Sequence, residues 1–168
     1  TSPMPAVVVD SSVLITLAAG EQFHLLREFY STIHIPPEVW KETTASARTF
    51  GVQEVQCAKA ERWLVVQSPQ DLAKVSSLPF NLQPGETEAL ALALELTGSL
   101  LLVDDAQGRK AAAALGLVYT GTLGVLLRAK AEGKIPALRP VLGLLAARTT
   151  FWLSAAVESA ALKQAGES

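Results

Sequence analysis

Five short runs of mostly apolar residues, each followed by a stretch with helical character, constrain the fold of this 168-residue chain most strongly. The runs occupy residues 6–10, 32–36, 63–67, 99–105 and 117–120. The clearest of them, AVVV and LLLV, lack the polar alternation of a strand with one wet face, so both of their faces should be covered. Strands that alternate with helices favour a parallel sheet. We therefore predict an α/β fold, a three-layer α/β/α sandwich around a mainly parallel central sheet of four to five strands.

Length and composition indicate one domain, residues 1–168, with a core at about 6–131 and C-terminal helices at about 136–165. Hydrophobic residues make up 49% of the chain, which is enough for a complete core. The single cysteine, Cys57, rules out a disulfide framework and suits a reducing, cytoplasmic setting. The N-terminus lacks a signal-peptide pattern, and glycines interrupt the longest uncharged run, so we expect no membrane span.

Acidic residues follow two of the predicted strands and also lie in neighbouring helices. Asp10 ends the first strand, and Asp104 and Asp105 end the fourth. Glu86 opens the helix that leads into the fourth strand, and Glu42 lies in the helix after the second. Because functional groups of an open parallel sheet gather beyond the carboxyl ends of its strands, these carboxylates should converge. Converging carboxylates repel one another unless a cation neutralises them, and Mg²⁺ or Mn²⁺ with oxygen ligands would do so.

Each of these acids also has a purely structural interpretation. Asp10 can cap the helix that follows it. Asp105 can be the N-cap of its own helix, which would leave Asp104 as the functional member of the pair. An acid in a first turn, such as Glu86, suits the helix dipole, and Glu42 alone is typical of an exposed helix residue. The structural interpretation weakens only when the acids are taken together.

Basic and hydroxyl side chains close to the acids in sequence are candidates for holding a substrate. Arg109 and Lys110 begin the helix after the Asp pair and could meet phosphates, although a solvated helix face also explains such charges. Thr120 and Thr122 flank a glycine after the last strand, where a phosphate could bind or where the chain simply turns and caps a helix. Ser11 can hydrogen-bond the carboxylates or cap a helix.

Large apolar side chains have two possible uses in this chain. Trp40, Trp63 and Trp152 are expected in the core or at an interface rather than as platforms for bases. The apolar face of residues 13–30 could form a groove for a partner helix, although core packing explains the same residues.

Four segments, taken in order, resemble the PIN-domain nucleases: VVVDSSVLI, PPEVWKE, GETEALALAL and LLLVDDAQGRKAAAALGL. The stretch VYTGTLGVLLRAKAEGKI resembles the same branch, and the likeness covers about residues 6–160. The resemblance implies a nuclease with an acidic pocket at one sheet edge, whose catalytic acids would be Asp10, Glu42, Glu86 and Asp104. Asp10, Glu86 and Asp104, with Asp105 as a further candidate, would hold Mg²⁺ or Mn²⁺. Many PIN domains have Asp where this chain has Glu86.

The function implied by this resemblance is a Mg²⁺- or Mn²⁺-dependent endoribonuclease that hydrolyses phosphodiester bonds of RNA. Free ribonucleases of this kind resemble the VapC-like toxins of toxin–antitoxin pairs, which implies a small antitoxin protein and a homodimer. The alternative is a PIN-fold module that binds nucleic acid or protein without catalysis. Other classes fit less well, because a phosphatase of the haloacid-dehalogenase type needs an acid where this chain has Ser12, and no P-loop is present.

Overall fold

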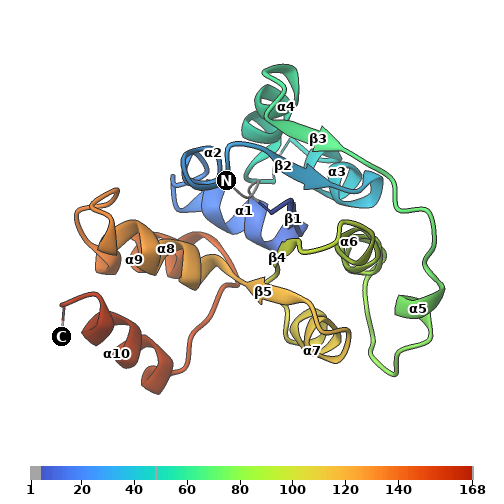
Figure 1. The fold of residues 1–168 in the computed structure, drawn as a ribbon. Coiled ribbons are helices and arrows are strands. Elements are labelled where there is room, and N and C mark those ends of the chain that lie inside the picture. The colour runs from blue at the N-terminus through green and yellow to red at the C-terminus, as the bar shows by residue number, and fades with distance from the viewer. Residues whose placement is uncertain (1–4, 48, 168) are drawn as a thin grey trace.

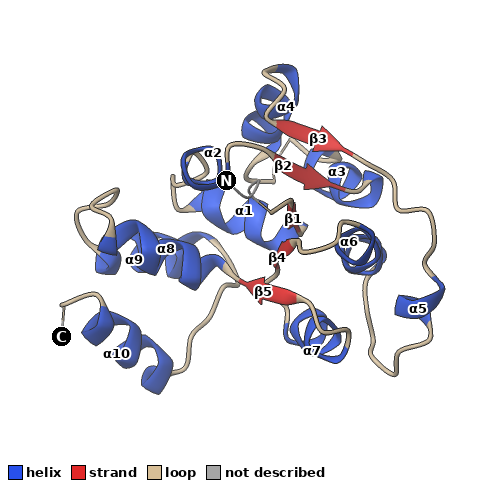
Figure 2. Cartoon of the chain, in the orientation of Figure 1, coloured by secondary structure: helices blue, strands red, loops and turns tan. Residues whose placement is uncertain are grey.

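The computed structural model describes residues 5–47 and 49–167 of the chain, so the ends of the predicted domain, residues 1–4 and 168, lie outside it. Within the described part, five strands pair in parallel in the order β3-β2-β1-β4-β5 (Figure 1, Figure 2). The strands are β1 (Val7–Val9), β2 (Ile33–Ile35), β3 (Leu64–Val66), β4 (Leu100–Leu102) and β5 (Val118–Thr120). The predicted parallel sheet is therefore confirmed.

Helices cover both faces of the sheet, because successive side chains of a strand point to opposite faces. Val7, Val9 and Leu102 belong to one hydrophobic cluster, whereas Val8 and Leu101 belong to a second. The first cluster includes residues of α1 (Ser11–Ala19), α2 (Leu25–Tyr30), α3 (Pro37–Thr44), α4 (Val52–Ala60), α8 (Thr122–Ala131), α9 (Leu138–Arg148) and α10 (Ala155–Gln164). The second includes residues of α5 (Ala73–Ser76), α6 (Pro84–Glu95) and α7 (Ala106–Ala114). The three-layer α/β/α sandwich is confirmed. No helix within residues 5–47 or 49–167 is long and apolar enough to cross a membrane.

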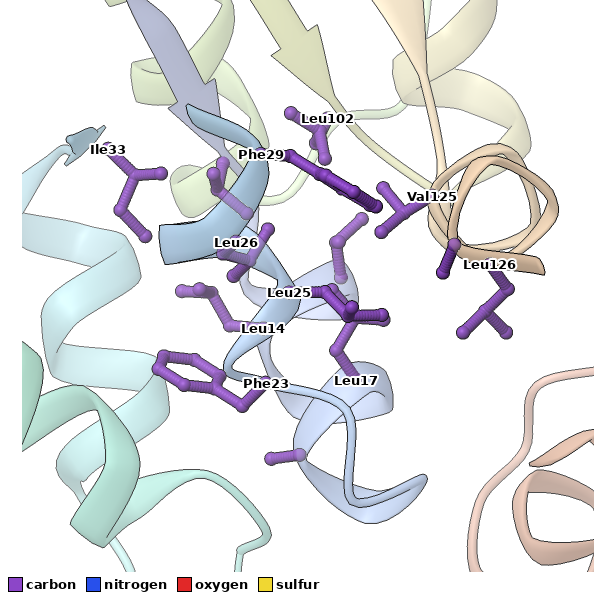
Figure 3. Packing of buried hydrophobic residues seen from close by; sticks show 14 of the residues in the cluster. Leu14, Leu17, Phe23, Leu25, Leu26, Phe29, Ile33, Leu102, Val125 and Leu126 are labelled. Carbon is purple, nitrogen blue, oxygen red and sulfur yellow. The ribbon is translucent and has the colours of Figure 1, made fainter. Parts of the chain in front are cut away.

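The helices α1 and α2 contribute many residues to the larger cluster (Figure 3). Val13, Leu14 and Leu17 of α1 and Leu25 and Leu26 of α2 are at most 1% exposed. Burial of one such leucine contributes about 1.5–3 kcal/mol to stability. Core packing therefore accounts for these buried side chains. Ala18, Phe23 and Arg27 of the same segment also line a cavity of about 470 Å³, so the groove for a partner helix stays a prediction.

Two segments outside the sheet are short or irregular. Residues 68–83 contain the short helix α5, which packs against α6 and buries Val75. Residues 149–154 form a non-helical linker between α9 and α10. The last helix begins only at Ala155, because the hydroxyl of Ser154 accepts the backbone N–H of Val157 at 3.1 Å and caps the helix there.

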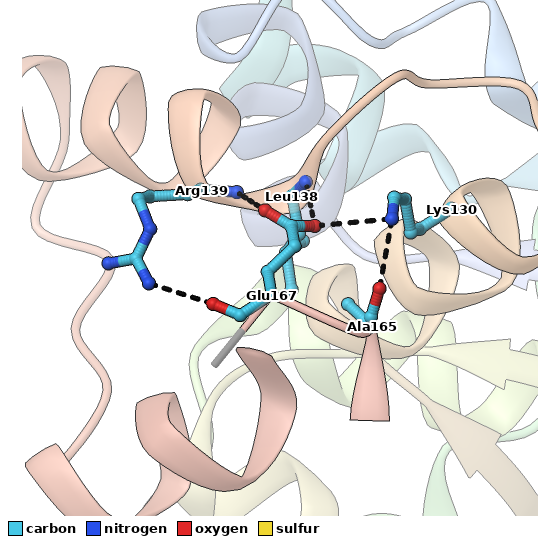
Figure 4. Close-up of polar contacts among 5 residues, drawn as sticks. All are labelled: Lys130, Leu138, Arg139, Ala165 and Glu167. Carbon is cyan, nitrogen blue, oxygen red and sulfur yellow. Dashed lines mark hydrogen bonds and ion pairs between the residues drawn. The ribbon is translucent and has the colours of Figure 1, made fainter. Parts of the chain in front are cut away.

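The end of the described chain is fastened to α8 and α9 (Figure 4). The carboxylate of Glu167 accepts hydrogen bonds from the backbone N–H groups of Leu138 and Arg139, at 2.6 and 3.0 Å, at the start of α9. Lys130 donates to the carbonyl oxygen of Ala165 at 2.9 Å and forms an ion pair with Glu167 at 3.7 Å. These contacts hold α10, and with it the linker, against the rest of the fold.

Candidate metal centre

Asp10 follows β1 directly and is only 2% exposed. It occupies the N-cap position of α1, but its side chain makes no capping hydrogen bond with that helix. One carboxylate oxygen, Oδ2, accepts the hydroxyl of Ser12 at 2.9 Å, whereas Oδ1 is buried without a hydrogen-bond partner among the described residues. Burial raises the pKa of Asp10 to about 6; the Ser12 hydrogen bond lowers this pKa, and the charge of Glu42 raises it. The backbone N–H groups of Ser11 and Ser12 lower this pKa as well, but the side chain forms no full capping hydrogen bond, so capping is at most a weak part of its role.

Glu86 lies in the first turn of α6 and is 7% exposed. Its Oε1 atom accepts the backbone N–H of Gln83 at 2.9 Å in a capping box, so one oxygen has the structural role that the sequence allowed. The other oxygen, Oε2, is buried and finds no donor in the described part of the chain. Burial raises the pKa of Glu86 to about 8; the Gln83 backbone lowers it, and the nearby Asp105 and Asp10 raise it further.

Asp104 lies just beyond β4 and is held by the N-terminus of α8. Its Oδ1 accepts the backbone N–H of Thr122 at 2.8 Å, and its Oδ2 accepts the Thr122 hydroxyl at 2.6 Å. Burial raises the pKa of Asp104, while the bonds from Thr122 and the positive charge of Arg109 lower it. Thr122 is fully buried and its hydroxyl donates to this carboxylate, a partner that neither sequence interpretation, a phosphate contact or a turn that caps the helix, had named.

Asp105 is an exposed N-cap residue, the structural role that the sequence allowed for it. Its Oδ2 accepts the backbone N–H groups of Gln107 and Gly108 at 2.9 and 3.1 Å, at the start of α7. A hydrogen bond between the carboxyl groups of Asp105 and Glu86, and then the charge of Asp105, also raise the pKa of Glu86. The two adjacent acids after β4 therefore have different partners.

Glu42 projects from α3 toward the start of α1, where its Oε2 accepts the hydroxyl of Ser11 at 2.7 Å. The neighbouring Ser12 binds Asp10, so two consecutive serines each hold one acid. Glu42 is exposed, as its sequence context alone suggested, yet its charge raises the pKa of the buried Asp10. Ser11 is therefore placed as a partner of a carboxylate.

Comparison with known proteins identifies the family. The model of a PIN-domain family matches residues 6–167. The chain belongs to the PIN-domain family. No curated protein matches it. PIN domains are generally nucleases, and they typically use divalent metal ions, so this PIN domain has a nuclease-type fold with an implied nucleic-acid substrate. The resemblance seen in the sequence is thereby confirmed for the family, while the roles of single residues stay predictions.

Two of the predicted substrate-binding residues of this PIN domain are exposed cations on α7, and one of them acts on Asp104. Arg109 lies with its guanidinium 5.4 Å from the ring centroid of Tyr119, and its charge lowers the pKa of Asp104. Lys110 is exposed on α7. Thr120 is half-buried, and its hydroxyl packs so closely on Gly124 that a Cβ at that glycine would collide with it.

Glycines next to the acids are the part of the site that sequence reasoning missed. A Cβ added at any of three glycines would press against a carboxylate, and the pairs are Gly85 with Glu42, Gly108 with Glu86 and Gly121 with Asp104. The bare backbone at these positions lets the acids pack close to neighbouring elements. The available signal was the presence of a glycine inside the motifs GETE, DDAQGR and TGT.

The acids of the PIN domain come together without forming a complete cage. No three histidine, cysteine, aspartate or glutamate side chains among residues 5–47 and 49–167 are arranged to hold a metal ion. Two unpartnered oxygens, on Asp10 and Glu86, remain buried between the elements. The charges of these two acids nevertheless interact, because Asp10 raises the pKa of Glu86.

Proposed function

We propose that this PIN domain is a Mg²⁺- or Mn²⁺-dependent endoribonuclease that hydrolyses phosphodiester bonds of RNA. The observation that carries the proposal is the pair of buried oxygens, Asp10 Oδ1 and Glu86 Oε2, for which the described residues supply no donor. A buried carboxylate oxygen without a partner costs folding free energy. A cation bound by both acids would offset that cost, and the raised pKa of each acid reflects the same unfavourable environment.

The residues present fit a hard divalent ion. The acids offer only oxygen atoms, which Mg²⁺ and Mn²⁺ prefer. Mg²⁺ usually keeps several waters and binds through one or two carboxylates, so a site without three converging side chains suits it. Asp104 can also contact the ion, because a carboxylate oxygen that accepts one hydrogen bond retains another lone pair. We assign Asp10 and Glu86 as the principal ligands. Asp104, the third predicted ligand, would border the same ion, and Glu42 is a further catalytic acid close to Asp10.

The chemistry is the addition of water across a phosphodiester bond. When bound, the ion lowers the pKa of a coordinated water and offsets the charge that develops on the phosphate. The chain itself orients the acids: the two serines at the start of α1 hold Asp10 and Glu42, and Thr122 fixes Asp104 through two hydrogen bonds. Such preorganisation lowers the cost of positioning groups during the reaction.

Substrate contacts follow from charge and position. We assign Arg109 and Lys110 to phosphates of the RNA backbone, because both are exposed cations on the helix that Asp105 caps. Thr120 and Ser11 lie beside the same acids as further polar groups. The role of a toxin, an antitoxin partner and a homodimer are narrower predictions that rest on the family resemblance alone. The cytoplasmic location is a prediction from the single cysteine.

Cleavage of total RNA tests the proposal. We expect the wild-type protein to cut RNA in Mg²⁺ and to stop when EDTA removes the metal. Asp10→Asn should slow cleavage by at least ~100-fold. Loss of a residue that only orients a metal ligand lowers activity by up to about 100-fold, and loss of the ligand itself should lower it at least as much. Asp105→Asn is the matched control, since asparagine preserves the helix cap. Wild-type protein that binds RNA but leaves it intact would favour the alternative, a binding module without catalysis.

A further inference from the structure

Trp152 has the largest exposed fraction of any large hydrophobic residue in the described chain, 78%. Core placement is confirmed for the other two tryptophans, because Trp63 is buried and Trp40 packs against the main cluster. An indole as exposed as that of Trp152 adds little burial free energy to the fold. Folding therefore does not explain why a tryptophan stands at this position.

The linker that carries Trp152 is held at both ends. Phe151 and Leu153, its two neighbours, are partly buried against the main hydrophobic cluster. The backbone N–H of Phe151 donates to the hydroxyl of Thr149 at 3.0 Å, and Ser154 caps α10. The contacts of Glu167 fasten α10 to the fold (Figure 4). Anchored neighbours on both sides leave the indole exposed while restricting its movement.

Trp152 borders a cavity that also reaches the candidate metal centre. The cavity has a volume of about 320 Å³, which is in the range of small-ligand sites. Besides Trp152, its walls include Asp104, Asp105, Ser12, Thr16 and Thr150. Figure 1 shows the linker between α9 and α10 passing the carboxyl end of β5, the sheet edge where the acids lie. An aromatic ring and a candidate metal ligand thus face one space.

We propose that Trp152 is a stacking platform for a nucleobase of single-stranded RNA bound at the metal centre. This inference rests on the proposed function, since it names a subsite for the same substrate. Single-stranded nucleic acids are commonly held by bases stacked on aromatic side chains, whatever the base. Hydroxyls and carboxylates line this cavity beside the rings of Phe151 and Trp152. Trp152 also borders a second cavity with Leu142 and Leu153, an apolar surround of the kind found at protein-binding hot spots. Only the first cavity joins the indole to the candidate metal ligand Asp104, and that connection is the reason for naming a nucleotide as the occupant.

Binding of fluorescein-labelled, single-stranded oligoadenylate tests the stacking role. Fluorescence anisotropy would be measured with Asp10 retained and with Ca²⁺ in place of Mg²⁺, a hard cation that also takes oxygen ligands, and gels would confirm that the RNA stays intact. Under these conditions we expect Trp152→Ala to weaken binding by at least ~5-fold, the lower end for loss of one base stack, and Trp152→Phe to retain most of it. Val157→Ala is the matched control. Val157 is a 45% exposed apolar residue on α10, and its substitution should leave RNA binding unchanged.

A double-mutant cycle with the RNA separates stacking from a general loss of affinity. Single abasic nucleotides would be placed at successive positions of the oligoadenylate. At one position, the abasic change should weaken binding to the protein that retains Trp152 and have little effect on binding to Trp152→Ala protein. The reason is that removing the base and removing the indole abolish the same contact, so their effects on the binding free energy do not add. Full additivity at every position would contradict the stacking contact.

The possible failures are distinguishable. Equal RNA binding with and without the indole, alongside normal cleavage by the wild-type protein, would overturn the stacking role alone. A wild-type protein that neither cuts nor binds RNA would overturn the proposed function and the stacking role with it. A change of oligomeric state in Trp152→Ala, measured by light scattering, with unchanged RNA affinity would assign the indole to a protein interface instead.

Discussion

At the scale of single residues, the fold favours the protonated forms of two buried acids. Burial is the main cause of the raised pKa values, about 6 for Asp10 against an ordinary 3.8 and about 8 for Glu86 against 4.5. Unfolding returns both side chains to water and to their ordinary pKa values. Between the ordinary and the raised value, the folded protein keeps a proton that the unfolded chain has released. The stability that each group contributes is therefore complete below its ordinary pKa and is lost as the pH rises through the raised value.

We accordingly predict that these two acids make the metal-free protein less stable as the pH rises through about 6 and then about 8. Glu86→Gln should remove the upper part of this loss and Asp10→Asn the lower part, because amides do not titrate. Urea unfolding at a series of pH values, with EDTA present, measures the effect. Saturating Mg²⁺ should reverse the slope in the wild-type protein, since the ion competes with protons for the same oxygens. An identical pH dependence in Glu86→Gln and wild type would show that Glu86 ionises normally in the folded state.

Residue roles could be predicted from the sequence where the determining contact is local. The cap formed by Asp105 joins neighbouring residues, so the sequence allowed for it correctly. The partner of Asp104 is Thr122, eighteen residues away, and their contact depends on how β4 and α8 meet. No local pattern encodes such an approach, so the sequence offered Thr122 a phosphate contact or a turn but not this carboxylate. For Ser11 the sequence allowed a hydrogen bond to a carboxylate, and the fold supplies Glu42 from another helix.

At the scale of elements, Asp105 stands at the start of α7, and substitutions of this residue distinguish a helix cap from a metal ligand. We predict that Asp105→Ala lowers the free energy of unfolding by about 1 kcal/mol, because the first turn of α7 loses its side-chain acceptor, while Asp105→Asn loses much less. Both variants should cleave RNA at close to the wild-type rate once folded. Chemical denaturation alongside a cleavage assay measures the two effects. Loss of cleavage in an Asp105→Asn protein of normal stability would instead make Asp105 a ligand.

The elements that the sequence missed are the short or irregular ones. A helix of four residues such as α5 offers about one turn of periodicity and lies among prolines, so its pattern is weak. The linker at residues 149–154 contains three consecutive apolar residues but is not helical. Phe151 and Leu153 pack on the core, Trp152 stays exposed, and the cap at Ser154 starts the next helix. Apolar character alone does not distinguish a buried helix from an anchored linker.

At the scale of the whole molecule, the parallel sheet brings acids from distant parts of the sequence to one edge. The all-apolar strands predicted the three layers, because both sheet faces had to be covered. The spatial order β3-β2-β1-β4-β5 was not predicted, since it depends on which strands pair rather than on any single segment. That order places β1 beside β4, and so brings Asp10 near the elements that carry Glu86 and Asp104.

The measurement that tests the central claim most directly is the position of Mn²⁺ in crystals soaked in millimolar MnCl₂, located by anomalous scattering. We predict one or more peaks within roughly 2.0–2.4 Å of carboxylate oxygens of Asp10 and Glu86, with Asp104 bordering the same density. The peak should disappear in crystals of Asp10→Asn. A wild-type crystal with no peak between these acids, or with Mn²⁺ bound only elsewhere, would contradict the assignment of this sheet edge as a metal centre.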